Sequence, residues 1–167
     1  MLFRAGRFAA ISGLLLIAAT SARGASPAGE LPKFRIKLLD KTILNSDDLR
    51  DKLAVIDFWG TWCKPCLEEI PQYNSFYADY REKGILFVAV AVESGSESKV
   101  RKDVKRLGIN YPVYVHQGRQ PDPFADVGVY PTTWLIQNGR IVKEFVGTPA
   151  GKHRDLREWA DKALAGN

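Results

Sequence analysis

The sequence predicts an α/β domain in which helices flank a central mixed sheet. Two apolar runs, Leu53–Trp59 and residues 85–92, each precede a stretch with helical spacing of apolar residues. This alternation is typical of buried parallel strands joined by right-handed crossovers. Residues 132–137 and 140–146 instead flank Asn138-Gly139, a pair that favours a tight turn between antiparallel strands. One sheet with both kinds of pairing follows.

Residues 1–24 have the pattern of a secretory signal peptide. Arg4 and Arg7 precede a short apolar run, and small residues follow. The run is shorter than the roughly 20 residues that a membrane-spanning helix needs, so we expect cleavage after Ala22 or Gly24, with an uncleaved inner-membrane anchor as the alternative. The protein is therefore expected in the periplasm or another extracytoplasmic space, where a cysteine pair meets oxidising conditions.

The net charge of +5 over 167 residues comes partly from this segment. Its loss would remove three of the 24 basic residues and none of the 19 acidic ones, which lowers the net charge to +2. So small a charge gives no support for a nucleic-acid partner, and we predict none. We expect a linker over residues 25–32 and then one domain with a single core over residues 33–167, which we expect to be a monomer.

The first elements of the domain are predicted to be short. Residues 34–39 and 42–44 alternate weakly about a turn, which predicts a hairpin. Ser46, followed by two aspartates, is expected to cap a short helix that ends near Lys52. These elements lead directly into the first buried strand.

A long helix is predicted after that strand, because apolar and aromatic residues recur at helical spacing from Cys66 to Tyr80. Gly84 is expected to stop it. Pro71 should kink it, because proline lacks a backbone donor and clashes with the preceding turn.

Further helices are predicted over residues 96–107 and 152–165, and a third strand over residues 111–115. The basic residues of the helix over residues 96–107 are interpreted as a solvated face, with a docking surface for an acidic partner as the alternative.

The segment FWGTWCKPC, residues 58–66, holds the only two cysteines of the chain. Because a strand leads directly into a helix here, Cys63 falls at the helix N-terminus, where free backbone N–H groups and the helix dipole stabilise a thiolate. Two intervening residues span nearly one helical turn, so Cys63 and Cys66 can close a disulfide or open as a dithiol. This predicts a redox site. A zinc site would lack two ligands, and a structural disulfide with so short a loop would stabilise the fold little.

Disulfide exchange needs an exposed thiolate, a resolving thiol and a proton acceptor. Cys63 is predicted as the nucleophile, with Lys64 and the helix N-terminus lowering its pKa. Cys66, on the buried side of the helix, is predicted as the resolving thiol. Burial raises the pKa of that thiol, so it needs a base nearby. We expect no metal and no cofactor other than the redox-active disulfide itself.

Two acidic residues are candidates for that base. Asp57 lies inside an apolar strand, where burial should raise its pKa, unless it is solvated at a strand end. Glu69 follows Cys66 by three residues and shares its helical face, but it could equally be a surface residue. Glu68 points elsewhere and can pair with Lys64 at i, i+4.

The motif WCKPC, the preceding LAVID and the later YPTTWLI and NGRIVKEFVG resemble the thioredoxin-fold proteins. Within that group the chain most resembles the TlpA/ResA-like extracytoplasmic thiol–disulfide oxidoreductases, from about Pro32 to the C-terminus. The resemblance implies a thioredoxin fold with an N-terminal hairpin extension and a helical insertion over residues 96–107. It also implies that Asp57 is the buried acid of the active site and that Glu69 lies near the active-site cavity.

The resemblance further implies a substrate-binding surface beside the cysteines. The peptide bond before Pro131 would be cis and face the pair, and the backbone of Tyr130 would offer strand-like hydrogen bonds to an extended substrate. Trp62 is expected at the exposed rim, whereas Trp59 is expected in the core. No chemistry is assigned to the two histidines, His116 and His153.

The resulting expectation is a reductase for one protein disulfide, such as the haem-binding cysteine pair of apocytochrome c or the thiol pair of a copper-site assembly protein. A membrane thiol electron donor would keep it reduced. Pro65 resembles reducing thioredoxins, whereas Lys64 stabilises the thiolate and makes the pair more oxidising, so an oxidase or isomerase of secreted proteins is the alternative. A redoxin-type peroxidase is disfavoured, because Thr61 lies only two residues before Cys63 and the matching proline is absent. A copper-binding chaperone is disfavoured by the two-residue spacing of the cysteines.

Overall fold

The computed structural model describes residues 29–118 and 122–166, so the predicted signal peptide and half of the predicted linker lie outside the described residues. A five-stranded sheet with the order β5-β4-β3-β6-β7 forms the centre of the domain. The pairs formed by β4 with β3 and β5 are parallel, whereas β6 pairs antiparallel with β3 and β7, which confirms the predicted mixed sheet. The strands are β3 (Leu53–Trp59), β4 (Ile85–Ala91), β5 (Val113–Val115), β6 (Thr132–Gln137) and β7 (Arg140–Val146).

The register of the sheet aligns residues that later form the site. Asp57 on β3 lies opposite Thr133 on β6 and beside Ala89 on β4. Directly opposed residues of paired strands direct their side chains to the same face of a sheet. The side chains of Asp57 and Thr133 therefore point to the same side.

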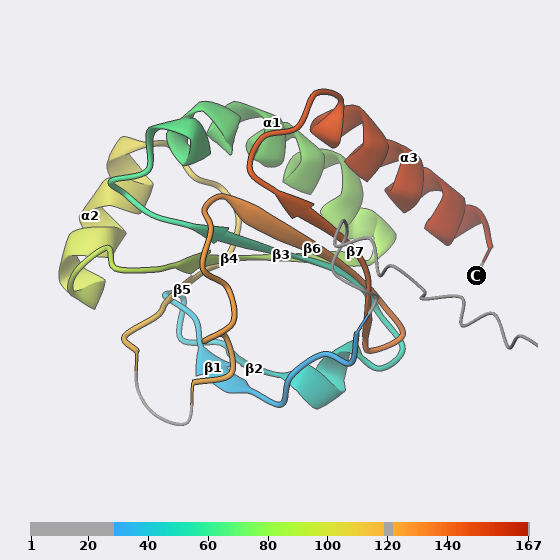
Figure 1. Ribbon diagram of the computed structural model, residues 1–167, viewed down its shortest axis with the longest axis horizontal. Coiled ribbons are helices and arrows are strands. Elements are labelled where there is room, and N and C mark those ends of the chain that lie inside the picture. The colour runs from blue at the N-terminus through green and yellow to red at the C-terminus, as the bar shows by residue number, and fades with distance from the viewer. Residues whose placement is uncertain (1–28, 119–121, 167) are drawn as a thin grey trace, which may run out of the picture.

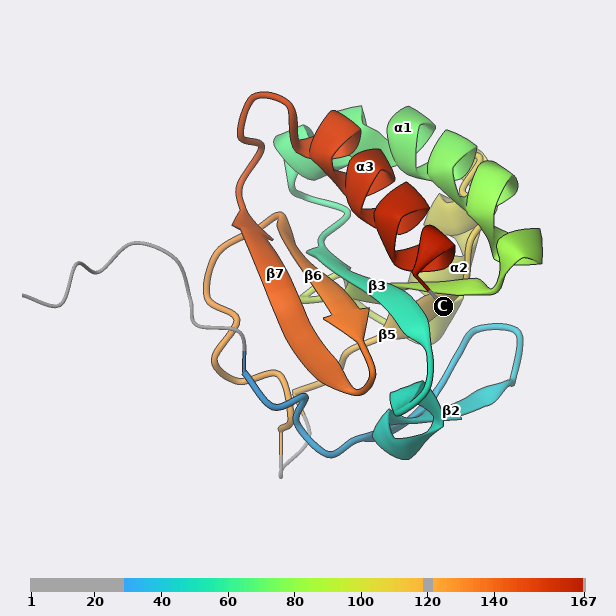
Figure 2. The ribbon, with the colours of Figure 1, turned by 90° about the vertical axis from the view of Figure 1, so that its right-hand side faces the viewer.

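One face of the sheet is covered by α1 (Lys64–Tyr80) and α3 (Lys152–Ala165), which lie side by side in Figures 1 and 2. The helix predicted over residues 96–107 is α2 (Glu97–Arg106), and it lies toward the β5 edge of the sheet (Figure 1). Its Val100 joins the core that α1 and α3 form with the sheet, and both cysteines belong to the same core. The two cysteines are thus part of the packed interior on the helical face.

The opposite face of the sheet is covered by the N-terminal segment (Figure 2). β1 (Arg35–Lys37) and β2 (Ile43–Asn45) form the predicted hairpin as a separate two-stranded sheet, and η1 (Ser46–Leu49) follows. Because both faces of the large sheet are buried, every residue of β3 is buried, which explains the continuous apolar run in the sequence. A second core on this side contains the aromatic residues Phe34, Phe58, Phe124 and Trp134.

One local feature of the helices differs from expectation. The short helix η1 is a 3-10 turn that begins after Asn45, whose backbone N–H donates to the Asp48 carboxylate at 2.8 Å, so Ser46 is inside the helix and is not its cap. The long helix α1 runs continuously through Pro71, and the kink expected at this proline stays a prediction. Buried side chains on both sides of the proline, at Ile70 and Tyr73, hold the helix against the sheet.

The ends of the other segments also refine the prediction. α1 is followed by a 3-10 turn, η2 (Arg81–Lys83), and Gly84 then takes φ 92°, as a helix stop requires. Residues 29–32, expected as the end of the linker, are attached to the domain: the N–H of Ile141 donates to the carbonyl of Gly29 at 3.0 Å, and Leu31 is buried. Within the described part of the chain, no helix combines the length and the apolar character needed to cross a membrane.

Candidate redox site

Cys63 and Cys66 form a disulfide at the N-terminus of α1, with their Cα atoms 5.3 Å apart. Cys63 is the N-cap residue of the helix, and its Sγ accepts a hydrogen bond from the backbone N–H of Cys66 at 3.3 Å. The predicted place of Cys63 is therefore confirmed. Its sulfur lies where the free N–H groups and the helix dipole favour negative charge.

The expected exposure of Cys63 is not found in the disulfide form. Cys63 is 4% exposed and Cys66 is 3% exposed, and Tyr130 packs against the core to which both belong. The physical reason is that both cysteines are part of the packed core. A substrate sulfur can reach Cys63 only if the packing around it changes or the disulfide opens.

Lys64 and Pro65 occupy the first turn of α1, between the cysteines. Proline suits this turn because the helix leaves the first N–H groups without an internal partner. The side chain of Lys64 is 88% exposed, and its Nζ lies 4.0 Å from Oε1 of Glu68, which confirms the predicted i, i+4 pair. Because solvent and salt screen so exposed a charge, we expect Lys64 to act only weakly on the Cys63 sulfur.

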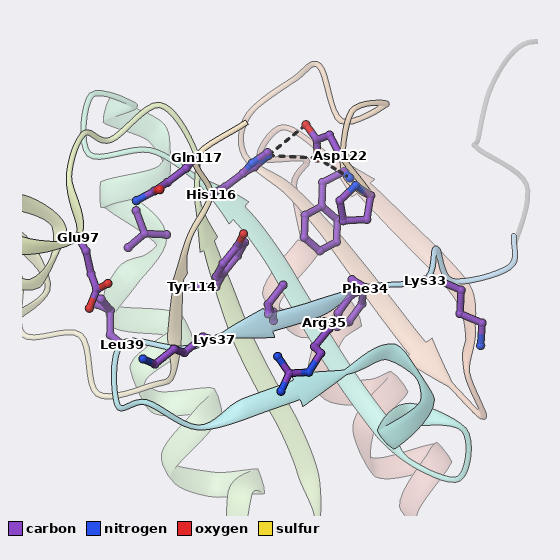
Figure 3. Close-up of a pocket in the computed structure, with 14 residues that line it drawn as sticks. Lys33, Phe34, Arg35, Lys37, Leu39, Glu97, Tyr114, His116, Gln117 and Asp122 are labelled. Atoms are coloured by element: carbon purple, nitrogen blue, oxygen red, sulfur yellow. Dashed lines mark hydrogen bonds and ion pairs between the residues drawn. The ribbon is translucent and has the colours of Figure 1, made fainter. Parts of the chain in front are cut away.

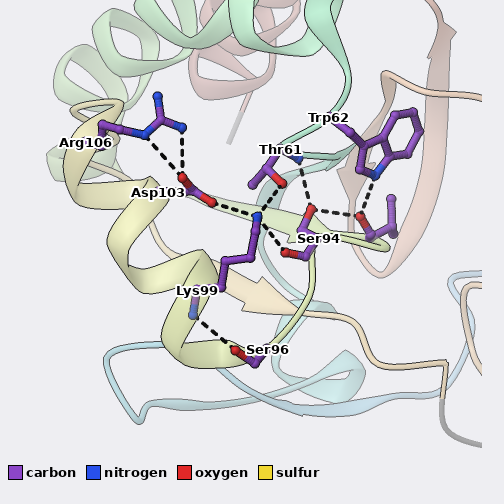
Figure 4. A network of polar contacts seen from close by, with 8 residues as sticks. Thr61, Trp62, Ser94, Ser96, Lys99, Asp103 and Arg106 are labelled. Atoms are coloured by element: carbon purple, nitrogen blue, oxygen red, sulfur yellow. Dashed lines mark hydrogen bonds and ion pairs between the residues drawn. The ribbon is translucent and has the colours of Figure 1, made fainter.

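The loop before Cys63 is tied to α2 through Lys99 (Figure 4). The ammonium of Lys99 donates to Thr61 Oγ1 at 3.2 Å, to the carbonyl of Ser94 at 3.2 Å and to Asp103 Oδ2 at 3.0 Å. The backbone N–H of Thr61 also donates to Ser94 Oγ at 3.0 Å. These contacts fix the position of the loop relative to the helical insertion.

Trp62 is the exposed aromatic residue of this loop. It is 53% exposed, as expected for the rim, whereas Trp59 is 2% exposed and lies in the core, as predicted. The Nε1–H of Trp62 donates to the carbonyl of Val92 at 3.3 Å (Figure 4), and its ring meets the ring of Tyr130 edge on, with centroids 5.8 Å apart. Gly60 leaves room for the indole, because a Cβ there would lie 2.6 Å from the Trp62 ring.

The peptide bond between Tyr130 and Pro131 is cis, as the resemblance implies. The hydroxyl of Tyr130 donates to the carbonyl of Val127 at 2.8 Å, and the carbonyl of Pro131 accepts from the N–H of Gly147 at 2.7 Å. The contact between Tyr130 and Trp62 shows that the cis-proline segment lies beside the loop that leads to the cysteines. Binding of substrate by this segment stays a prediction.

Asp57 is buried in the middle of β3, at 3% exposure. Its Oδ1 accepts hydrogen bonds from the hydroxyl of Tyr73 at 3.0 Å and from Thr133 Oγ1 at 2.8 Å. Burial raises the pKa of Asp57 from 3.8 to about 6, although the positive charge of Lys152 and the two hydroxyl donors oppose that rise. A carboxyl group with this pKa can exchange a proton near neutral pH, as the predicted base must.

Oδ1 of Asp57 and the hydroxyl oxygens of Tyr73 and Thr133 are in mutual contact, because the two hydroxyls also lie 2.8 Å from each other. Three such contacts need three hydrogens, and two hydroxyl groups supply two. A carboxylate can accept from both hydroxyls at once, and a protonated Asp57 carboxyl would supply the third hydrogen. The cluster can therefore accommodate Asp57 in either protonation state.

Glu69 is also buried, which is the outcome that the sequence left open. Its Oε2 accepts a hydrogen bond from Nζ of Lys152 at 2.9 Å, and its Oε1 lies 3.1 Å from Nε2 of His153. Both partners come from the beginning of α3, 83 and 84 positions along the chain. A cavity of about 280 Å³ is lined by all three residues and by Pro65 of the redox motif. Glu69 is thus placed near a cavity at the active-site end of α1.

Sequence reasoning misses Lys152 and His153. A lysine at the start of an amphipathic helix normally lies in solvent, so nothing local to the sequence indicates that Lys152 is buried. His153, to which no chemistry is assigned, packs its ring against Tyr73 at 5.0 Å between centroids and contacts Glu69. Only the packing of α3 against α1 brings these side chains to the site.

A separate cavity of about 540 Å³ lies between β1 and the segment that follows β5 (Figure 3). None of the predicted redox residues lines it, so it is not part of the disulfide site. His116 lines it and contacts Asp122 at 3.1 Å, a local pair that leaves this histidine outside the redox site. Over residues 29–118 and 122–166, no three His, Cys, Asp or Glu side chains are grouped so as to hold a metal ion.

Comparison with known proteins agrees with this geometry. Residues 27–145 match the model of the AhpC/TSA family. The thiol–disulfide oxidoreductase ResA of Bacillus subtilis (strain 168) is 35% identical over 124 residues, which cover 74% of this chain and 69% of the relative. ResA of Bacillus thuringiensis (strain Al Hakam) is 34% identical over 119 residues, which cover 71% of this chain and 68% of the relative.

A solved structure of another protein shares this fold. The crystal structure of a thiol:disulfide interchange protein of the thioredoxin family from Chlorobium tepidum TLS superposes with a TM-score of 0.69 at 25% identity. The superposition covers 84% of this chain and 99% of the other. The thioredoxin fold, with its N-terminal hairpin, is confirmed.

Proposed function

The chain belongs to the AhpC/TSA family and to the ResA-like thiol–disulfide oxidoreductases, and from this premise we propose that it reduces one specific protein disulfide outside the cytoplasm. The observation that supports this best is the Cys63–Cys66 pair at the N-terminus of α1, preceded by a strand that holds a buried acid, Asp57. The pair supplies two electrons, and the acid can take up a proton near neutral pH.

The reaction begins with the reduced pair. The Cys63 thiolate attacks one sulfur of the substrate disulfide, that disulfide breaks, and the other substrate sulfur leaves as a thiolate. Cys66 then gives its proton to Asp57 and attacks Sγ of Cys63, which releases the second substrate sulfur. Two electrons have passed to the substrate, and the Cys63–Cys66 disulfide has formed.

The surface beside the pair suits an extended polypeptide. In this proposal the backbone at Tyr130 and Pro131 binds the substrate segment, and the exposed indole of Trp62 packs against it. Candidate substrates are the haem-binding cysteine pair of an apocytochrome c and a thiol pair of a copper-site assembly protein. Residues 1–24 would direct the chain across the membrane, where a membrane thiol donor would reduce it again.

The reduction potential of the Cys63–Cys66 couple tests the direction of electron flow. We expect a value close to that of thioredoxin, about −270 mV, after equilibration of the purified protein with a thiol buffer at pH 7. A value near about −120 mV would instead identify an oxidant of secreted proteins. Peroxidase activity is not proposed, because the segment before Cys63 lacks the proline of a peroxidatic motif.

Trapping of the mixed disulfide tests substrate specificity. With Cys66→Ala, the resolving thiol is absent, so Cys63 should hold its substrate covalently and release it only under reducing conditions. The variant that lacks both cysteines is the control and should hold nothing. Recovery of many unrelated proteins in equal amounts, or of none, would contradict a dedicated substrate.

A further inference from the structure

Lys152 is an unusual residue for a protein interior. It is 2% exposed, and it is the only lysine or arginine buried among residues 29–118 and 122–166. Its ammonium contacts Glu69 Oε2 at 2.9 Å and the carbonyl of Gly147 at 3.3 Å, and it lies 5.5 Å from the centre of the Tyr73 ring. A buried ion pair gives little net stability, because both charges lose their hydration. Stability alone therefore does not explain this lysine.

The surroundings of Lys152 connect it to the predicted proton acceptor. Tyr73 lies under the Lys152 ammonium, and its hydroxyl donates a hydrogen bond to Asp57 Oδ1. Burial is the main cause of the raised pKa of Asp57; the charge of Lys152 is the largest effect that lowers it, and the charge of Glu69 raises it further. The titratable groups packed around the two carboxyl groups, Asp57 and Glu69, are Tyr73 from α1, Lys152 and His153 from α3, and Tyr111 before β5.

The two buried carboxyl groups differ in their partners. Both oxygens of Glu69 are already engaged, one by Lys152 and the other by His153. The hydrogen bonds to Asp57 come from hydroxyl groups, and a hydroxyl can accept a hydrogen bond as well as donate one. Asp57 can therefore change its protonation state without the loss of an ion pair, whereas protonation of Glu69 would break one.

We propose that Lys152 is a positioning residue for disulfide exchange: its ammonium holds the Glu69 carboxylate in an ion pair, so that Asp57 and not Glu69 takes the proton of Cys66. This inference rests on the proposed function, because it assumes that Cys66 resolves a mixed disulfide. Without Lys152, the two carboxyl groups would share the interior with no buried cation between them. Asp57 would then hold its proton to a higher pH, and the site would lose its acceptor near neutral pH.

The test is a titration of Asp57 in the full chain, followed by carboxyl carbon NMR and assigned with Asp57→Asn. In Lys152→Met the midpoint should rise by at least about one pH unit, whereas in Glu69→Gln it should fall, because each variant removes one of two opposed charges. The double variant should return toward the native midpoint. Lys162→Met, an exposed lysine of the same helix, is the matched control and should leave the midpoint unchanged.

A kinetic readout links the titration to the reaction. The pH midpoint of the resolution step, measured by stopped flow on a preformed mixed disulfide with a thiol reagent, should rise in Lys152→Met by the same amount as the Asp57 midpoint. An unchanged Asp57 midpoint would overturn the inference, and so would an unchanged pH profile of resolution. If Lys152→Met does not fold, the double variant, which buries no unpaired charge, should have a higher Asp57 midpoint than Glu69→Gln alone, and equal midpoints in these two variants would overturn the inference. Trapping and the reduction potential test the proposed function separately, because neither depends on Lys152.

Discussion

Two neighbouring glutamates on α1 form ion pairs of opposite character. Glu68 pairs with Lys64 at 4.0 Å, and the two side chains are 67% and 88% exposed. Glu69 pairs with Lys152 at 2.9 Å, and those side chains are 7% and 2% exposed. The same two residue types thus meet once in water and once in the core, within one turn of the redox-active disulfide.

The difference shows how position decides what a charge can do. Water and salt screen the outer pair, so it affects the cysteines and the stability only slightly. The inner pair is shielded from water, so each of its charges acts strongly on the buried Asp57. We therefore expect the exposed rim to contact a substrate and the buried pair to control the proton of the resolving step.

The largest expected effect contrasts the two glutamates directly. Glu69→Gln leaves the Lys152 ammonium buried without its counter-charge, and we expect a loss of about 3–5 kcal/mol in the free energy of unfolding. Glu68→Gln removes only an exposed partner, and we expect a change within about 0.5 kcal/mol. Denaturant unfolding at pH 7 measures both. Equal losses would show that burial does not distinguish the two pairs.

The next effect concerns the pH dependence of stability. Because the folded-state pKa of Asp57, about 6, exceeds its ordinary value of 3.8, the protonated carboxyl favours the folded state. That contribution is complete below pH 3.8 and is lost as the pH rises through 6, and the shift of about two units corresponds to roughly 3 kcal/mol. Asp57→Asn cannot titrate, so its stability relative to the native protein should increase between pH 4 and pH 8.

Asp57→Asn also tests the role of this acid in catalysis. Resolution by Cys66 should slow in the variant by roughly 10²-fold or more, as expected for loss of a general base, while the initial attack by Cys63 changes little. Stopped-flow kinetics of the two steps would separate these effects. Equal slowing of both steps would remove Asp57 from the role of base.

A smaller effect is expected at the rim. Lys99→Met removes the contacts of the ammonium with Thr61, Ser94 and Asp103, which loosens the loop that presents Trp62. We expect KM for a protein substrate to rise roughly 2–5-fold, because the lost hydrogen bonds are partly exposed, with little change in kcat. Lys102→Met on the same helix is the control. A change in kcat alone would place Lys99 in the chemistry and not in the presentation of Trp62.

The smallest effect is expected for Lys64→Gln. The lost charge is exposed, so the pKa of the Cys63 thiol should rise by less than about half a unit, and less at high salt. Thiolate absorbance of the reduced protein measures this pKa. A rise of more than about one unit would show that Lys64 acts on the sulfur at close range, in spite of its exposure in the disulfide form.

Local sequence determined the elements and the place of the chemistry. The apolar run into which Asp57 is set predicts a strand buried on both faces, and therefore a buried acid, because every neighbour in the run is apolar. The spacing of Cys63 and Cys66 at the junction of this strand with a helix predicts a redox pair at a helix N-terminus. These inferences succeed because periodicity and capping depend on residues within one or two turns of each other.

Tertiary structure alone decided which groups surround the pair. The ion pair of Glu69 with Lys152 joins residues 83 positions apart, and it exists because α3 packs beside α1. Likewise, Thr133 reaches Asp57 only through the antiparallel register of β6. A lysine or a threonine has no local pattern that reveals its partner across a core. The charge balance around the redox pair therefore follows from packing between distant elements, which no window of sequence contains.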